Sequence, residues 1–277
     1  MLKFLNIYIC KMKIGFLYAL IFLLSVTSCT SDDNSNSNGT GSSTMSTPLL
    51  NYSVLASYPH DTSSFTQGLT FYNGELYEGT GLEGKSRIMQ VDLKTGKAVR
   101  STSLDPQLFG EGITILNDTI YQLTWQNKKV LVYTARDFKL VREMNLNTEG
   151  WGITDNGEEL IVSTGDSNLY FYDASDFRLL RTQGITENGS PAPNLNELEF
   201  INGYVYANQW QYPYILKIDP SSGQVVAKLD LTDIVNRAKA KDPKVDFLNG
   251  IAYNPETKKI YVTGKLWPEI YELDFPH

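Results

Sequence analysis

The sequence predicts an all-β fold, a five-bladed β-propeller with four antiparallel strands in each blade. One short phrase returns five times along the chain, in copies that begin at Phe65, Phe109, Glu149, Asn194 and Asp246. Each copy combines an apolar strand, an Asn/Asp/Gly turn and a second strand, which is the pattern of a β-hairpin. The copies, aligned on their centres, lie 40 to 53 residues apart. A hairpin that recurs at this interval is typical of a propeller or a solenoid.

The first 28 residues lie outside the repeats. They contain three lysines and no acidic residue, and their apolar stretch runs from Ile14 to Val26. This stretch is too short to span a bilayer comfortably and is typical of a signal-peptide core. We therefore predict a signal peptide over residues 1–28.

The segment after the signal peptide begins with a cysteine. Val26-Thr-Ser-Cys29 resembles a bacterial lipobox, which implies that Cys29 is lipidated and becomes the first residue of the mature protein. A plain secretory signal with an incidental cysteine is the alternative. Residues 29–49 are rich in Ser, Asn and Gly and predict a flexible tether, because they offer little apolar surface to bury. The expected location is the cell envelope, outside the cytoplasm, with the lipid as the only contact to the membrane.

The propeller is predicted over residues 50–277. Four segments of the first repeat alternate in period two, as strands do: 66–72, 75–81, 87–92 and 98–103. A turn of Asp, Ser, Pro or Gly after the third strand recurs in the first four repeats. The fifth repeat ends after three strands, and residues 52–57 are predicted to supply its fourth. This pairing would close the ring and remove an exposed sheet edge.

Two segments interrupt the regular spacing. Residues 187–194 contain two prolines and predict a surface loop. Residues 230–241 contain an N-cap candidate and good helix formers, and they predict a short helix before the fifth repeat. Either segment is a candidate for the rim of a substrate site, although ordinary loop variation also explains both.

The composition argues against several classes of function. The net charge of −7 is unfavourable for a nucleic-acid partner, which needs a basic surface. Both cysteines, Cys10 and Cys29, precede the repeats, and the chain has only two histidines. A cysteine-ligated zinc, a multi-histidine metal site and a Ser-His-Asp triad are therefore not expected. We expect a monomer with no cofactor, in which any bound calcium would be structural.

A glycine-rich segment at residues 79–86 matches the phosphate-loop pattern and ends in Lys85-Ser86. A phosphate loop is followed directly by a helix, whose amino terminus binds the anion. Here Arg87-Ile-Met-Gln-Val-Asp follows and alternates as a strand. We therefore interpret the segment as a turn between the second and third strands and expect no nucleotide binding.

Polar and aromatic residues gather at the positions that a propeller brings to its central channel. The first strand of each blade lines that channel, so residues at the starts of these strands converge. They are Phe65, Gln67, Glu111, Trp151, Asn196, Glu197 and Asn249. The second strands end in three further candidates, Trp125, Trp210 and Lys265. Two interpretations stay open: a substrate site, or a polar channel whose buried groups satisfy one another.

Ordered motifs across residues 52–274 carry a family resemblance. They include Phe65-Thr-Gln-Gly-Leu, Glu111-Gly-Ile-Thr, Leu195-Asn-Glu-Leu-Glu199, Ala207-Asn-Gln-Trp210 and Val262-Thr-Gly-Lys265. Together they resemble the plant and bacterial type of glutaminyl-peptide cyclotransferase. The resemblance implies a five-bladed propeller enzyme that converts the N-terminal glutamine of a peptide or protein into pyroglutamate and releases ammonia. The unrelated animal enzyme for this reaction is a zinc protein, and the scarcity of histidine here agrees with the propeller type.

This reaction assigns hypothetical roles to the two charged candidates. Glu111 is the proposed proton shuttle, because a desolvated carboxylate can act as base and acid in turn. Its alternatives are a counter-charge to the substrate ammonium and a structural hydrogen bond. Lys265 is the proposed stabiliser of the oxyanion, with an ion pair to Glu111 or Glu197 as the alternative.

The remaining candidates are expected to bind the substrate. Gln67 and Asn196 each offer a donor and an acceptor, which complement a primary amide. Trp125, Trp151 and Trp210 would wall the pocket, or else pack blade against blade. Further contacts are expected from Phe65, Glu197 and Asn249.

Two other functions remain as alternatives. One is a metal-dependent, lactonase-like propeller hydrolase that uses Glu111, Asn196, Glu197 and Asn249 as ligands. The other is a non-catalytic binding lipoprotein. Chelator sensitivity distinguishes the first from a cyclotransferase, and tolerance of Glu111→Gln distinguishes the second.

Overall fold

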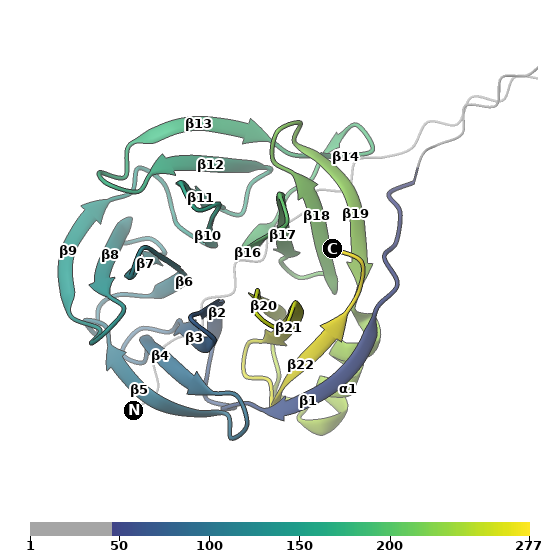
Figure 1. The fold of residues 1–277 in the computed structure, drawn as a ribbon, viewed down its shortest axis with the longest axis horizontal. Coiled ribbons are helices and arrows are strands. Elements are labelled where there is room, and N and C mark those ends of the chain that lie inside the picture. The colour runs from purple at the N-terminus through teal and green to yellow at the C-terminus, as the bar shows by residue number, and fades with distance from the viewer. Residues whose placement is uncertain (1–45) are drawn as a thin grey trace, which may run out of the picture. The chain divides into compact units, whose positions relative to one another are not determined.

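The computed structural model describes residues 46–277, which form a ring of five β-sheets around a central axis (Figure 1). The predicted signal peptide, Cys29 and most of the predicted tether lie outside the described residues. No helix within this part of the chain is long and apolar enough to cross a membrane.

The first three blades each contain four consecutive strands. The first blade contains β2 (Thr66–Tyr72), β3 (Glu75–Thr80), β4 (Arg87–Asp92) and β5 (Lys97–Ser103). The second contains β6 (Gly110–Leu116), β7 (Thr119–Thr124), β8 (Lys129–Thr134) and β9 (Leu140–Asn145). The third contains β10 (Ile153–Asp155), β11 (Glu159–Val162), β12 (Asn168–Asp173) and β13 (Leu179–Gly184). The prediction of a four-stranded antiparallel blade is confirmed.

The last two blades repeat this plan. The fourth contains β16 (Leu195–Ile201), β17 (Tyr204–Gln209), β18 (Tyr214–Asp219) and β19 (Gln224–Asp230). The fifth contains β20 (Leu248–Asn254), β21 (Lys259–Gly264), β22 (Glu269–Asp274) and β1 (Ser53–Pro59). Because β1 pairs antiparallel with β22, the amino-terminal strand forms the outer edge of the last blade, as a closed ring requires.

The two interruptions of the repeat take different forms. The predicted surface loop at residues 187–194 is partly wrong, because it contains most of a small hairpin, β14 (Thr186–Glu187) and β15 (Ser190–Pro191). This hairpin extends the outer edge of the fourth blade, where β14 pairs in parallel with β19. The predicted helix is present as α1 (Thr232–Lys241) and lies between the fourth and fifth blades.

The end of the predicted tether also contacts the outer edge of the fourth blade. The Lys228 N–H donates to the Pro48 carbonyl at 2.9 Å, and the Leu50 N–H donates to the Lys228 carbonyl at 2.8 Å. An edge strand presents unpaired backbone groups to any extended chain that follows it. The chain therefore contacts the fourth blade a few residues before β1 begins.

The apolar core lies in layers between neighbouring blades. In the layer between the first and second blades, Ile88 packs with Ile113, Ile120 and Leu131. Equivalent clusters join every other neighbouring pair, including the fifth blade and the first, where Tyr261 and Leu69 belong to one cluster. Burial falls from the axis outward: every residue of β6 is buried, whereas β9 is almost entirely exposed.

Glycine allows the inner strands to approach one another. A Cβ on Gly112 would lie 2.8 Å from the Trp151 carbonyl oxygen and the Ile153 nitrogen of the next blade. A Cβ on Gly152 would overlap the carbonyl oxygen of Asn196. In the second and third copies, the glycine at the centre of the repeated phrase is thus a packing requirement between blades.

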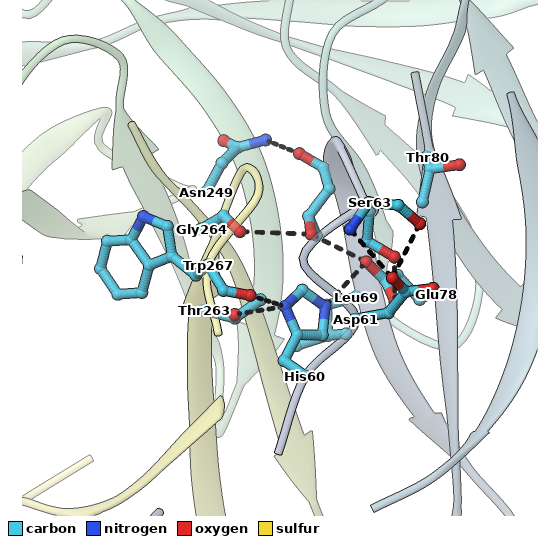
Figure 2. A network of polar contacts seen from close by, with 12 residues as sticks. His60, Asp61, Ser63, Leu69, Glu78, Thr80, Asn249, Thr263, Gly264 and Trp267 are labelled. Carbon is cyan, nitrogen blue, oxygen red and sulfur yellow. Dashed lines mark hydrogen bonds and ion pairs between the residues drawn. The ribbon is translucent and has the colours of Figure 1, made fainter. Parts of the chain in front are cut away.

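A buried polar network joins the first and last blades at the closure of the ring (Figure 2). His60 Nδ1 lies 2.8 Å from the Trp267 carbonyl oxygen and Nε2 lies 3.1 Å from Glu78 Oε1. The Thr66 hydroxyl donates to the same carboxylate at 2.8 Å. Burial alone would lower the pKa of His60, but Glu78 and the Trp267 carbonyl outweigh it and raise the pKa. The imidazole therefore connects the first blade with the fifth.

Replacing Gly152 by Ala should destabilise the ring, because the new methyl group has no space between two inner strands. We expect a loss of roughly 3 kcal/mol in the free energy of unfolding. The matched control is Gly184→Ala in an outer strand, where the nearest atom is Asn168 Oδ1 at 3.7 Å. Urea unfolding followed by tryptophan fluorescence measures both variants. Equal midpoints for the two would contradict the packing requirement.

Candidate active site

A break in strand register recurs at the start of the first strand in four blades. The register between first and second strands shifts at Thr66/Gly68, Gly110/Ile113, Leu195/Leu198 and Leu248/Ile251. Such a bulge leaves residues outside the ladder and redirects their side chains. The shifted segments contain Gln67, Glu111, Asn196, Glu197 and Asn249. The local fold thus turns polar residues of the repeated phrase toward the axis.

A cavity of about 320 Å³ lies at the end of the channel where the first strands begin. Eight of the ten predicted catalytic and substrate-binding residues line it: Phe65, Gln67, Glu111, Trp125, Trp151, Asn196, Trp210 and Lys265. Glu197 and Asn249 do not line it. Of these eight, the four polar residues are buried at the bottom, whereas the four aromatic residues are partly exposed at the rim.

Three lining residues were missed by the sequence analysis: Phe109, Asp246 and Phe247. Phe109 and Phe247 stand three positions before the central glycines, as Phe65 does, so aligning the copies would have identified them. This position has a repeated backbone role: the carbonyls of Phe109 and Phe247 accept from the N–H groups of Trp125 and Lys265, at 3.1 and 3.0 Å. A backbone hydrogen bond thus joins each of these two phenylalanines to the residue that follows the second strand of the same blade.

Glu111 is a buried carboxylate without a partner among residues 46–277. Its side chain comes from the bulge of β6 and the residue is 5% exposed. None of the described residues donates a hydrogen bond to it or forms an ion pair with it. Burial raises the pKa of Glu111 well above its usual range, with Lys265 opposing and Glu149 reinforcing the shift. The group is therefore available to bind or release a proton inside the cavity.

Lys265 follows β21 and is also 5% exposed. Its Nζ lies 4.7 Å from the centroid of the Phe65 ring, which is a cation–π contact. Burial lowers the pKa of Lys265, and the negative charges of Glu111 and Asp246 oppose that shift. No carboxylate in the described part of the chain lies within 4.0 Å of the ammonium. The cation is thus held at the cavity without a direct ion pair.

Two amide side chains supply complementary hydrogen-bonding groups. Asn249 Nδ2 donates to Gln67 Oε1 at 3.1 Å and to the Thr66 carbonyl at 3.0 Å, which orients the Gln67 amide. The Gln67 NH₂ group thereby remains available to the cavity. The Oδ1 of Asn196 is buried and lacks a hydrogen-bond partner in the described structure. Gln67 and Asn196 both line the cavity, whereas Asn249 bonds to Gln67 from outside the lining.

Aromatic rings build the wall in two runs. Phe65, Phe109 and Trp125 meet edge to face, with centroids 6.2 and 5.6 Å apart. Trp151 and Trp210 form a second edge-to-face pair at 5.4 Å. Two indole N–H groups share one carboxylate oxygen as their acceptor. Trp125 Nε1 donates to Glu149 Oε2 at 2.9 Å, and Trp151 Nε1 lies 3.5 Å from the same atom. Glu149 thus orients rings from two blades.

Glu197, a predicted substrate-binding residue, does not line the cavity. Its two carboxylate oxygens accept from the Leu69 N–H at 3.1 Å and the Ile251 N–H at 2.8 Å. These bonds connect β16 with β2 and β20 across the axis. Burial and the neighbouring Glu199 raise the pKa of Glu197 well above its usual range. In the aligned copies Glu111 directly precedes the central glycine, whereas Glu197 occupies the glycine position itself, so the repeat already placed the two carboxylates at different positions.

Two of the four ligands of the metal-dependent alternative, Glu111 and Asn196, line the cavity, whereas Glu197 and Asn249 do not. Both oxygens of Glu197 accept from backbone N–H groups. Within residues 46–277, no three or more His, Cys, Asp or Glu side chains are grouped so that they could hold a metal ion.

Comparisons with known proteins identify the family. The model of a family described as glutamine cyclotransferase matches residues 20–275. The chain is 37% identical over 223 residues to a glutaminyl-peptide cyclotransferase of Arabidopsis thaliana, covering 79% of this chain and 70% of that protein. The structure matches the crystal structure of Myxococcus xanthus glutaminyl cyclase with a TM-score of 0.78 and 32% identity, covering 82% of this chain and 98% of that chain. The chain therefore belongs to the glutamine cyclotransferase family and is an enzyme of that activity.

Proposed function

We propose that the enzyme cyclises the N-terminal glutamine of a peptide or protein inside the cavity at the end of the channel, without a metal ion. One observation supports this location above all. Glu111, a buried carboxylate with no partner among residues 46–277, shares a cavity with Lys265 and with an unpaired amide oxygen on Asn196. These groups match the proton, oxyanion and amide requirements of the reaction.

The first requirement is the folded-back shape of the substrate. The α-amine and the γ-amide carbonyl belong to one residue. A pocket that holds them in contact therefore lowers the activation barrier for the attack of one on the other. The Gln67 NH₂ group would donate to the γ-carbonyl, and Asn196 Oδ1 would accept from the γ-amide nitrogen. The aromatic wall would exclude water from the ring that forms.

The second requirement is movement of one proton. Glu111 takes a proton from the α-nitrogen as that nitrogen bonds to the γ-carbonyl carbon, and the carbonyl electron pair moves onto oxygen. The Lys265 ammonium stabilises this oxyanion. Glu111 then gives the proton to the γ-amide nitrogen, the carbon–nitrogen bond breaks, ammonia leaves and the carbonyl re-forms. A carboxyl group with a raised pKa suits both transfers.

Replacing Glu111 by Gln should lower kcat by roughly a hundredfold or more, because the proton shuttle is removed and the shape is kept. Ammonia release from a glutamine-initiated peptide is measured with chelator present, using residues 46–277. The control is Glu199→Gln, another buried carboxyl with a raised pKa, which accepts from the Tyr253 N–H outside the cavity.

We expect that control to keep near wild-type turnover. Equal turnover by wild type and Glu111→Gln would assign the shuttle to another group. Loss of wild-type turnover on chelation would contradict metal independence.

Replacing Lys265 by Met should change the pH profile as well as the rate. The cation favours ionised Glu111 and holds its pKa down, so its removal lets the pKa rise further. Because ionised Glu111 accepts the proton, the acid limb of kcat/KM should move to higher pH, and kcat should fall roughly a hundredfold. Lys265→Arg retains the charge and should retain the position of the limb. An unmoved limb in Lys265→Met would refute the coupling.

We propose further that Cys29 carries a lipid anchor that holds a monomeric enzyme in the cell envelope, outside the cytoplasm. The lipobox-like residues before Cys29 and the polar composition of residues 30–45 support this proposal. Fatty-acid labelling of expressing cells should mark the wild type and the control Cys10→Ser, but not Cys29→Ser. Label retained in Cys29→Ser, or absent from the wild type, would exclude the anchor.

A further inference from the structure

A second hollow adjoins the cavity and extends away from it over the surface. It has a volume of about 370 Å³ and runs between the turn at residues 211–213 and helix α1. Residues 245–248 form its floor. Two residues, Asp246 and Phe247, line both the hollow and the cavity. We call this hollow the α1 groove. The cavity and the groove therefore meet along a shared boundary.

The α1 groove is attached rigidly to the catalytic end of the channel. The Leu231 N–H, just before α1, donates to the Pro213 carbonyl at 2.8 Å and joins the two walls. On the floor, the Asp246 N–H donates to the Lys265 carbonyl at 2.9 Å. The Phe247 ring meets the Trp210 ring edge to face at 5.9 Å. The groove consequently has a fixed position relative to Lys265 and the aromatic wall.

Aromatic surface is exposed along the groove. Tyr212 is 48% exposed and Phe247 is 38% exposed, although both are large rings on a rigid scaffold. Tyr212 is held in place by its N–H, which donates to the Gln209 carbonyl at 3.0 Å, and by stacking on Tyr214 at 6.2 Å. Exposed apolar surface beside a pocket marks a binding region more often than it does elsewhere. Asn236 and Thr232 add polar groups from α1.

The substrate itself requires a path out of the cavity. Only its first residue reacts, so the rest of the peptide continues from that residue's own carbonyl group. The bottom of the cavity is closed by the packed inner strands and by buried Asn249 and Glu197. The peptide must therefore leave across the rim. The α1 groove adjoins that rim at Phe247.

We propose that the α1 groove is the subsite for the residue that follows the N-terminal glutamine, and that it selects an apolar or aromatic side chain there. This inference rests on cyclisation in the adjoining cavity. The second side chain lies between Tyr212 and Phe247, and the polar groups of Thr232 and Asn236 contact the peptide backbone. The helical insertion before the fifth blade thus provides specificity.

Two tripeptide amides that differ only at the second residue test the proposal, Gln-Phe-Ala-amide and Gln-Gly-Ala-amide. We expect the wild type to favour the phenylalanine peptide about tenfold in kcat/KM, mainly through KM, because a partly buried ring adds binding. In Tyr212→Ala and in Asn236→Trp, which fills the groove, this ratio should fall to about one. The matched control is Leu180→Ala, a 40% exposed residue on β13 of another blade, which should keep the wild-type ratio.

Turnover of the glycine peptide distinguishes failure of the subsite proposal from failure of the proposed cyclisation. If the wild type turns over both peptides equally, the subsite is overturned while the site of cyclisation stands. If the ratio survives in both Tyr212→Ala and Asn236→Trp, the preference arises outside the groove and the subsite is again overturned. If neither peptide is cyclised by folded wild type, the proposed function and the subsite both fall.

Discussion

The free edge of the innermost strands is the constraint on which the rest of the structure depends. Each first strand pairs with a second strand on one side only, and its other edge faces the channel, where unpaired backbone groups are costly. Side chains from neighbouring strands satisfy them. Glu197 accepts from the N–H groups of Leu69 and Ile251, and Glu199 accepts from Tyr253. The packed channel is therefore held by hydrogen bonds as well as by glycine contacts.

The active site lies where a side-chain carboxylate of an inner strand has no backbone N–H group to bind in the described part of the chain. Glu111 and Glu197 come from equivalent bulges, and burial raises the pKa of both. Glu197 faces two backbone N–H groups, whereas none of the described residues donates to Glu111, which faces the cavity. A perturbed pKa alone therefore does not distinguish a structural carboxylate from a functional one; the hydrogen-bond partners do.

Ring closure and the site share one segment of chain. His60 contacts the Trp267 carbonyl, the Trp267 indole donates to the Asp246 carbonyl, and the Asp246 N–H donates to Lys265. The fully buried Trp267 ring packs over Gly264, directly before Lys265. The interactions that fasten the last blade to the first thus also position the cation of the cavity.

The sequence by itself determined the number of blades, the four-stranded plan and most of the cavity lining. Each of these follows from a local pattern that repeats: strand alternation, turn residues and the phrase whose bulge carries Gln67, Glu111 and Asn196. The repeat also contained Phe109 and Phe247, because both occupy the position of Phe65 in their own copies.

Only the tertiary structure gave Glu197 its backbone hydrogen bonds and left Glu111 facing the cavity, placed Asn249 behind Gln67 and joined the α1 groove to the cavity. It also showed the hairpin of β14 and β15, which depends on the available edge of β19. These features arise from contacts between residues that lie far apart in the chain. Local periodicity predicts on which face of its strand a side chain lies. Long-range packing decides which residues contact that side chain.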